Sequence, residues 1–432
     1  MAQEAANEAG AWSVIRVTGG NFLEMYDFQI FGYYAAAIGG TFFPSRDPFI
    51  SLMASFMTFG AAFLMRPLGA IVLGAYADKH GRRAGLLLTL SLMSVGIVSL
   101  TFMPGYAVIG LAAPILILGG RLLQGFSAGM ELGGVSVYLA EIAPPGRKGF
   151  YTAWQSGSQQ VAVVVSAAFG IALATRLSPS ALVDWGWRVP LGFGCLIVPL
   201  LLFLRRSLPE TRAFKARTIH PGWSEILRTL AGHWRRVGAG MMLTVLTTVT
   251  FYMITVYTPA FGTQTLHLAS LPVFVVTLLV GVSNFVWLPV MGAVSDRLGR
   301  KPVMIAISTA MLLSAYPAML WLVQAPSFGR LLAVELWFSF VFGGYNGALV
   351  AYLTEIIPAS VRASGLSLAF SLATALFGGF TPAISTLLVH ATGNRAVPGL
   401  WLTAAAAISL VATLFAKPAE EDAKAPNRHP PL

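Results

Sequence analysis

Runs of apolar residues, each followed by a short polar stretch, recur along almost the whole chain. An α-helix needs about 20 consecutive apolar residues to cross a bilayer, and each run is close to that length. The pattern predicts twelve membrane-spanning helices, at residues 19–43, 51–76, 85–104, 110–133, 150–174, 188–206, 237–260, 271–292, 302–323, 330–353, 363–388 and 397–416.

The composition indicates which solvent surrounds these helices. Of the 432 residues, 56% are hydrophobic and 10% are charged, whereas soluble domains carry about 25% charged residues. Too few polar residues remain to cover a water-facing surface, so lipid is the solvent for most of the chain. The predicted fold class is an all-α membrane protein with two six-helix bundles.

The longest polar connection divides the chain into two halves. The predicted parts are an N-terminal six-helix bundle (1–206), a cytoplasmic linker (207–236), a C-terminal six-helix bundle (237–416) and a disordered cytoplasmic tail (417–432).

The first apolar run is interpreted as a retained span and not as a signal peptide. It carries Glu24 and Asp27 and lacks a small-residue cleavage site. The single cysteine, Cys195, excludes an intrachain disulfide and a multi-cysteine metal site.

The net charge of +11 follows from topology. With both termini cytoplasmic, 21 Lys and Arg residues fall on the cytoplasmic side and 5 on the other, while Arg66 and Arg121 lie inside spans. Such an excess is typical of cytoplasmic loops, so we expect a multi-pass protein of the bacterial inner membrane. The basic excess does not indicate nucleic-acid binding.

Two short motifs occur in both halves. A Gly-x-x-x-Asp-x-x-Gly-Arg-(Arg/Lys) loop carries Asp78 after the second span and Asp296 after the eighth, 218 positions apart. A Tyr-Leu-x-Glu-Ile motif carries Glu141 after the fourth span and Glu355 after the tenth, 214 positions apart. Two halves related by an axis along the membrane normal are typical of transporters, which bind the substrate between the halves near the midplane of the membrane.

The doubled loop resembles the loop motif of the major facilitator superfamily. Other stretches resemble its metabolite:proton symporter branch, and within that branch the chain is most similar to the citrate–proton and tricarballylate carriers. The resemblance implies a proton-coupled symporter that imports a tricarboxylate by alternating access. The stretches that carry it are Gly20–Phe28, Arg66–Gly69, Arg121–Gly129, Trp154–Gln160, Thr250–Pro259 and Gly343–Ala348.

Ionisable side chains inside the predicted spans are the first functional candidates. Each costs about 2.5–3.5 kcal/mol on insertion scales, and such residues usually serve transport. Asn21, Glu24 and Asp27 recur every three residues and share one face of the first span, while Arg121 and Glu131 share a broad face of the fourth. The ionisable set is Glu24, Asp27, Arg66, Arg121, Glu131 and Glu335.

Resemblance to the related sugar porters implies that Asp27 pairs with Arg121 and couples the proton. A carboxylate holds a neighbouring guanidinium, and its protonation releases the arginine for a carboxylate of the substrate. Substrate binding and proton uptake are then linked. The alternative is that buried ion pairs only hold the helices together. The proton-coupling candidates are Glu24, Asp27, Arg121 and Glu131.

Substrate binding is expected to use fixed positive charge, because arginine binds carboxylates through two parallel hydrogen bonds. In the alternative, Arg66 neutralises Glu24 where Pro67 interrupts the helix. Polar and aromatic groups inside spans are weaker candidates, since they more often join helices. The substrate-binding candidates are Asn21, Arg66, Arg121, Gln124, Gln155, Gln159, Tyr252, Tyr345 and Asn346.

The repeat also exposes a difference between the halves. The position 214 residues after Arg121 is Glu335, and the seventh span has no acid that corresponds to Asp27. Charge chemistry is therefore expected mainly in the first half, while the second half offers polar groups such as Asn284.

The charged loop residues are gating candidates. The family resemblance implies that they form clusters that hold the two halves together in the outward-facing state; the alternative is that they only shape loops and set topology. They are Asp78, Arg82, Glu141, Arg147, Asp296, Arg300, Glu355 and Arg362.

Several function classes are disfavoured. The chain lacks a Gly-x-x-x-x-Gly-Lys-(Ser/Thr) phosphate-binding loop, so the proton gradient, without ATP or a cofactor, is the expected driving force. The six histidines have no metal-ligand spacing, and no nucleophile–base pair indicates an enzyme. We expect a monomer in the lipid bilayer. A symporter for a dicarboxylate, shikimate or betaine, or an exporter of cations or drugs, remains an alternative; a sensor or a passive channel is disfavoured.

Overall fold

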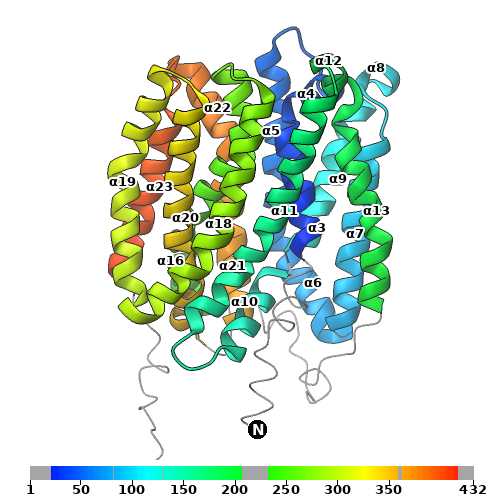
Figure 1. Cartoon of the computed structure of the whole chain (residues 1–432). Helices are drawn as coiled ribbons and strands as arrows, with labels where there is room; N and C mark the ends of the chain where they lie inside the picture. The colour runs from blue at the N-terminus through cyan, green and yellow to red at the C-terminus, as the bar shows by residue number, and fades with distance from the viewer. Residues whose placement is uncertain (1–20, 81, 130, 207–231, 359–361, 417–432) are drawn as a thin grey trace, which may run out of the picture.

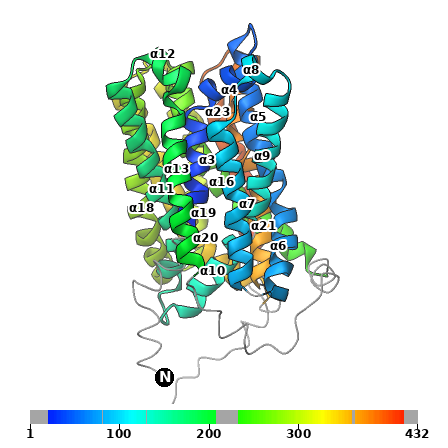
Figure 2. The same ribbon diagram turned by 90° about the vertical axis from the view of Figure 1, so that its right-hand side faces the viewer.

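The structure, a computed structural model, describes residues 21–80, 82–129, 131–206, 232–358 and 362–416. The described elements are helices, with no strand among them. They run side by side and form two groups, one from each half of the chain (Figures 1 and 2). We refer to the lower end in Figure 1, which carries α10 (Glu131–Ile142), as the α10 end, and to the opposite end, which carries α8 (Tyr106–Ile109), as the α8 end.

The first group consists of six helical passes in the described part of the chain. They are α3 (Asn21–Tyr33) with α4 (Ala35–Phe42), α5 (Pro48–Leu64) with α6 (Arg66–His80), α7 (Arg82–Phe102), α9 (Ala112–Ala128) with α10, α11 (Lys148–Arg176) and α13 (Arg188–Arg206). The connections at the α8 end hold α8, α12 (Pro179–Ala181) and the π-helix η1 (Leu182–Gly186).

The second group repeats this plan. Its passes are α16 (Trp234–Tyr252) continued by η2 (Met253–Tyr257), α17 (Thr258–Ala260) and η3 (Phe261–Thr265); α18 (Ser270–Leu298); α19 (Arg300–Gln324); α20 (Phe328–Ile356); α21 (Arg362–Ala373) with η5 (Thr374–Gly378) and α22 (Thr381–Thr392); and α23 (Pro398–Phe415).

Each predicted span coincides with one of these passes, which confirms the predicted all-α fold of twelve helices. The boundaries differ most in the fourth pass, which extends to Ile142 and does not end at 133. Helix propagation is cooperative and continues beyond the apolar run that favours it. The predicted linker lies mostly outside the described residues, and α16 already begins at Trp234.

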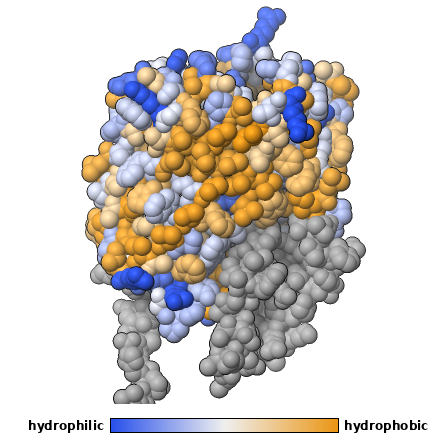
Figure 3. Space-filling view, viewed as in Figure 1, coloured by the Kyte–Doolittle hydropathy of each residue, from blue (hydrophilic) through white to orange (hydrophobic). Residues whose placement is uncertain are grey.

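On the face shown in Figure 3, hydrophobic side chains form a broad band, and hydrophilic side chains gather towards its upper and lower edges. Nine of the described helical segments are long and apolar enough to cross a membrane, and α9 is a shorter apolar helix. Large apolar side chains such as Leu196 and Leu313 are 76% and 70% exposed. In water so large an apolar surface would cause association, so the band is the surface that faces lipid.

Several passes are interrupted near their middle. The second pass breaks at Met65, just before Pro67, which has no N–H to donate and whose ring clashes with the preceding turn. The seventh pass widens into π-helices on both sides of Pro259, and the eleventh widens into η5 before Pro382. Interrupted helices of this kind are common at the binding sites of transporters, where they change the direction of side chains.

The two groups touch closely between α11 and α18. A Cβ atom built on Gly292 would lie 2.5 Å from the carbonyl oxygen of Gly149, so both positions need glycine for the backbones to meet.

Candidate functional site

Two buried ion pairs lie along one face of α3. Nη1 of Arg121 donates to Oδ2 of Asp27 at 2.5 Å and to Oε1 of Gln124 at 2.7 Å. Nη2 of Arg66 donates to Oε1 of Glu24. These residues are at most 6% exposed, so four charges lie together inside the bundle.

The local sequence explains this placement. Glu24 and Asp27 are three residues apart and point the same way from α3. Arg66 is the first residue of α6, immediately after the break in the second pass. Arg121 and Gln124 are also three residues apart, on α9.

Aromatic rings enclose both guanidinium groups. The guanidinium carbon of Arg121 lies 3.8 Å from the ring centroid of Phe31, and that of Arg66 lies 4.7 Å from the centroid of Phe63. The ring of Phe28 is shared, at 5.2 Å from Arg66 and 5.6 Å from Arg121. Ring faces attract cations, and an apolar surrounding strengthens every charge interaction inside it.

The site holds more hydrogen-bond donors than it uses. Among the described residues, Nε and Nη2 of Arg121, Nε of Arg66 and Nε2 of Gln124 are buried without an acceptor. Buried donors are normally bonded, so a cluster of free N–H groups suits a ligand rich in acceptor oxygens. Oδ1 of Asp27 is also unbonded.

The C-terminal half closes the site on the other side. The ring of Tyr252 packs against Phe63 at 5.1 Å between centroids. Asn346 on α20 is buried with Oδ1 unbonded.

Two further hydrogen bonds join the halves, and their partners from the first half were not predicted. Nε2 of Gln29 donates to Oγ1 of Thr255 at 3.3 Å. Nδ2 of Asn284 donates to Oε1 of Gln160 at 3.1 Å, and the hydroxyl of Ser339 donates to Oδ1 of Asn284 at 2.7 Å. Gln29 and Gln160 were missed because one sequence does not show which face of a span meets the other half.

Three predicted binding residues have different surroundings. Gln155 is buried and accepts a hydrogen bond from its neighbour Ser156 at 2.7 Å, and Gln159 is buried at 8% exposure. The hydroxyl of Tyr345 donates to the carbonyl of Leu243 at 2.9 Å, so it joins α20 to α16 within the second half.

The side chains of four candidates lie outside the described part of the structure. Two of them were predicted at the central site and two at the gate. They are Asn21, Glu131, Asp78 and Arg82.

Towards the α8 end, the halves meet above the ion pairs. The ring of Phe49, at the start of α5, stacks on His390 of α22 with centroids 3.7 Å apart. Phe56 and Tyr257 make a further contact between the halves, at 6.0 Å. These contacts join the two halves at the α8 end, and Arg66 and Arg121 are only 2% and 1% exposed in this arrangement.

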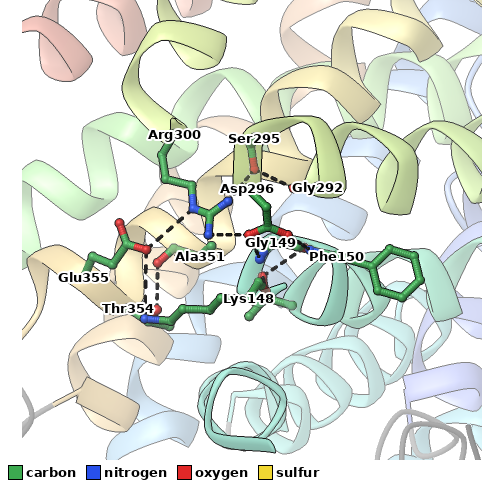
Figure 4. A network of polar contacts seen from close by, with 11 residues as sticks. Lys148, Gly149, Phe150, Gly292, Ser295, Asp296, Arg300, Ala351, Thr354 and Glu355 are labelled. Atoms are coloured by element: carbon green, nitrogen blue, oxygen red, sulfur yellow. Dashed lines mark hydrogen bonds and ion pairs between the residues drawn. The ribbon is translucent and has the colours of Figure 1, made fainter. Parts of the chain in front are cut away.

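At the α10 end, Asp296 of α18 contacts the start of α11 (Figure 4). Its two carboxylate oxygens accept hydrogen bonds from the backbone N–H groups of Gly149 at 2.7 Å and Phe150 at 3.0 Å. A helix N-terminus presents free N–H groups and a partial positive charge, so a carboxylate there is favourable. The contact joins the two halves directly.

Further charges extend this contact. Arg300 lies 2.6 Å from Asp296 and 3.5 Å from Glu355 of α20, and Lys148 of the first half lies 4.0 Å from Glu355. We call this set the latch cluster: Lys148, Gly149, Phe150, Asp296, Arg300 and Glu355.

Only part of the predicted gate takes part in the latch cluster. The side chains of Glu141 and Arg147 are exposed and lie outside it, and Arg362 donates to the carbonyl of Ile357 at 3.4 Å. Lys148 and the two backbone donors were not predicted, because backbone N–H groups leave no signal in the residue types.

A metal site is not evident. Within the described residues there is no group of three or more His, Cys, Asp or Glu side chains close enough to hold a metal ion.

Comparison with known proteins gives a consistent result. Residues 17–371 match the family model described as Major Facilitator Superfamily. The citrate-proton symporter of Salmonella typhi is 57% identical over 416 residues, which cover 96% of each chain. The citrate-proton symporter of Klebsiella pneumoniae is 58% identical over 410 residues, which cover 95% of this chain and 92% of the relative.

A solved structure shares the fold. The xylose transporter XylE from E. coli, in a partially occluded inward-open conformation, superposes with a TM-score of 0.74 over 94% of this chain and 98% of its own, at 18% identity. Together with the doubled loop motif and the two six-helix groups, these matches show that the chain belongs to the major facilitator superfamily.

Proposed function

We propose that this chain is a proton-coupled symporter that imports a tricarboxylate, with citrate as the lead substrate and tricarballylate as its nearest alternative. It acts as a monomer in the inner membrane without a cofactor. The α10 end and both termini lie in the cytoplasm, because the basic loops lie at that end. The names of two relatives at 57% and 58% identity support citrate.

The observation that carries the proposal is the group of unbonded donors beside the two ion pairs. The free N–H groups of Arg66, Arg121 and Gln124 can all be satisfied by carboxylate oxygens. Oδ1 of Asp27 is also free, but Glu24 and Asp27 each already bind an arginine, so a cation would have to compete with a guanidinium for either carboxylate. The site therefore suits an organic anion.

The charge balance of the site explains why protons are needed. Glu24, Asp27, Arg66 and Arg121 carry two negative and two positive charges. Adding an anion to this neutral set leaves a net buried charge, which is costly. Each proton that binds to Glu24 or Asp27 frees one guanidinium for one substrate carboxylate, so the anion and the protons enter together.

Alternating access follows from the two closures around the site. The Phe49–His390 contact closes the α8 end, and the latch cluster closes the α10 end. Opening one end while the other stays closed would expose Arg66 and Arg121 to one solution at a time. Tyr252 and Asn346 would complete the contacts to substrate from the second half.

The test is uptake of radiolabelled citrate into proteoliposomes that contain the purified protein. An imposed inward proton gradient is expected to drive accumulation, and an uncoupler is expected to abolish it. Asp27→Asn is expected to abolish gradient-driven accumulation while citrate exchange across the membrane persists. Asp184→Asn removes the same charge from an exposed position in η1 and serves as the matched control.

Two outcomes would contradict the proposal. Active protein that carries no citrate, but carries a dicarboxylate or a betaine, would overturn the substrate. Citrate accumulation that is unchanged by the uncoupler, or by Asp27→Asn, would overturn the coupling mechanism.

A further inference from the structure

Glu335 is a buried acid that the proposed mechanism does not use. It lies on α20, 4% exposed, seven residues after Phe328, where that helix begins at the α8 end. At 1.5 Å per residue, this places it about 10 Å from that end of the helix. The latch cluster, which includes Glu355, lies at the opposite end of α20.

The partner of Glu335 is neutral. Oε1 is 2.7 Å from the hydroxyl of Thr258 on α17, and Oε2 has no partner in the described structure. No cation in the described residues lies within ion-pair distance of Glu335. Arg330, five residues earlier on α20, instead donates to the carbonyl of Trp321 at 2.7 Å.

The helices that pack around Glu335 carry other titratable groups. None of those on the neighbouring helices makes a hydrogen bond or ion pair with Glu335 in the described structure. Towards the α8 end they are Tyr257 of η2, Tyr316 of α19 and Arg176 of α11. Towards the α10 end they are Asp296 and Arg297 of α18, Arg300 and Lys301 of α19, Arg235 and Arg236 of α16, Lys148 and Tyr151 of α11, Tyr138 and Glu141 of α10, and Arg362 of α21; Tyr252 of α16 and Tyr345 of α20 lie between.

The hydroxyl of Thr258 links the protonation state of Glu335 to the π-helical turn of the seventh pass. The hydroxyl of Thr258 also lies 3.1 Å from the carbonyl oxygen of Met253, inside the π-helical turn η2. A hydroxyl has one proton to donate. If Glu335 is neutral, it donates to Thr258, which donates to Met253, and the chain is complete. If Glu335 is ionised, Thr258 turns to the carboxylate, and a buried charge remains without a cation.

The sequence repeat gives this contact a counterpart. Passes 7 and 10 correspond to passes 1 and 4, and Glu335 occupies the position 214 residues after Arg121. In the first half those two passes are joined by Asp27 and Arg121, and in the second half by Thr258 and Glu335. In each half, one titratable carboxyl group thus lies at the contact between two equivalent helices, passes 1 and 4 in the first half and passes 7 and 10 in the second.

We propose that Glu335 is a second proton-binding residue of the transport cycle, one that is neutral when the carrier is closed and ionises when the α8 end opens. This inference rests on the proposed symport function. Ionised Glu335 cannot return to its dry position without a proton or a cation. Closure of α17 against α20 therefore requires a proton from the external solution, in addition to any proton carried by Asp27.

The external pH is therefore expected to change the rate at which the carrier closes. Raising the external pH increases the ionised fraction of open carriers, so closure becomes slower and citrate exchange falls. In Glu335→Gln the group is always neutral, and closure no longer needs this proton. Citrate is already fully ionised in alkaline solution, so its own titration does not change in that range.

The experiment is exchange of labelled citrate in proteoliposomes with equal citrate and equal pH on both sides, repeated across an alkaline pH series. Glu335→Gln is expected to retain about tenfold more exchange than the unaltered chain at the pH where the latter has lost 90% of its activity. Glu335→Asp, which still titrates, is expected to keep the alkaline decline, as is the exposed control Asp184→Asn. Superimposable pH profiles for Glu335→Gln and the unaltered chain would overturn the inference.

A second measurement covers the case in which Glu335→Gln does not fold or the chain does not carry citrate. Infrared spectra of Asp27→Asn in lipid, where Asp27 no longer contributes, are expected to show a protonated-carboxyl band that weakens as the pH rises. The band is expected to shift on Thr258→Val and to return on Thr258→Ser. A band that is absent, or that stays unchanged through the alkaline range, would contradict the inference. Failure of citrate exchange in the unaltered chain would instead contradict the proposed function.

Discussion

The two halves join the same pair of helices in chemically different ways. In the first half, Arg121 binds Asp27, a cation paired with an anion. In the second half, Thr258 binds Glu335, a hydroxyl paired with a carboxyl group. An ion pair can remain buried with both groups charged, whereas a lone carboxylate in the same surrounding is costly. The first arrangement suits recognition of an anion, and the second suits detection of a proton.

Among the substitutions that test this comparison, the largest effect on transport is expected at Arg121. Arg121→Lys keeps the charge but loses the planar group that binds both Asp27 and Gln124. Charge-assisted hydrogen bonds contribute about 1.5–3 kcal/mol each, so the kcat/KM for citrate is expected to fall about 100-fold. Initial uptake rates over a range of citrate concentrations measure this. A change smaller than about threefold would show that the second half supplies most of the recognition.

Arg66 is expected to matter for binding more than for proton coupling. Arg66→Lys retains a cation beside Glu24 but loses the fork geometry and the stacking on Phe63. The KM for citrate is expected to rise about tenfold, which corresponds to about 1.4 kcal/mol, while an uncoupler still abolishes accumulation. A loss of gradient dependence would instead assign the coupling role to the Glu24–Arg66 pair.

A substitution in the latch cluster is expected to have a smaller effect, which is a shift in the equilibrium between the closed and open conformations of the α10 end. Asp296→Asn removes the charge that binds Arg300 and the N-terminus of α11, a loss of about 1 kcal/mol or slightly more. The fraction of carriers open at the α10 end is expected to rise several-fold. Spin labels on the exposed positions 147 and 298, in a Cys195→Ser chain, would report it as a longer distance. An unchanged distance distribution would show that the cluster does not hold the halves together.

The smallest effect is expected for the Asn284–Gln160 contact between α18 and α11. Hydrogen bonds between helices in membranes contribute about 0.6 kcal/mol on average. A double-mutant cycle with Asn284→Ala and Gln160→Ala, read from thermal unfolding in detergent, is expected to give a coupling of that size. A coupling several times larger, accompanied by a loss of citrate binding, would indicate that these residues hold substrate.

How much could be predicted from the sequence depends on the kind of signal. The spans were predictable because lipid imposes long apolar runs. The pairing of Asp27 with Arg121 was expected from the resemblance to the sugar porters, and the structure has this contact. The contact of Asp296 with α11 was not predictable, since its partners are backbone N–H groups.

Helix ends and helix faces account for other differences. The prediction chose Arg147 for the gate, whereas the neighbouring Lys148 contacts Glu355. Likewise it chose Gln159, whereas Gln160 meets Asn284. Adjacent residues on a helix point about 100° apart, so a shift by one position decides which residue faces the other half.

The glycine contact between α11 and α18 has a kinetic consequence. Gly149 and Gly292 bring two backbones together without side chains between them, so few interlocking atoms need to be displaced when one helix slides over the other. The activation barrier for exchange between conformations is then set by the aromatic contacts at the α8 end and the latch cluster at the α10 end. A single added methyl group at position 292 would create a steric obstacle of its own and slow turnover even if every charge stayed in place.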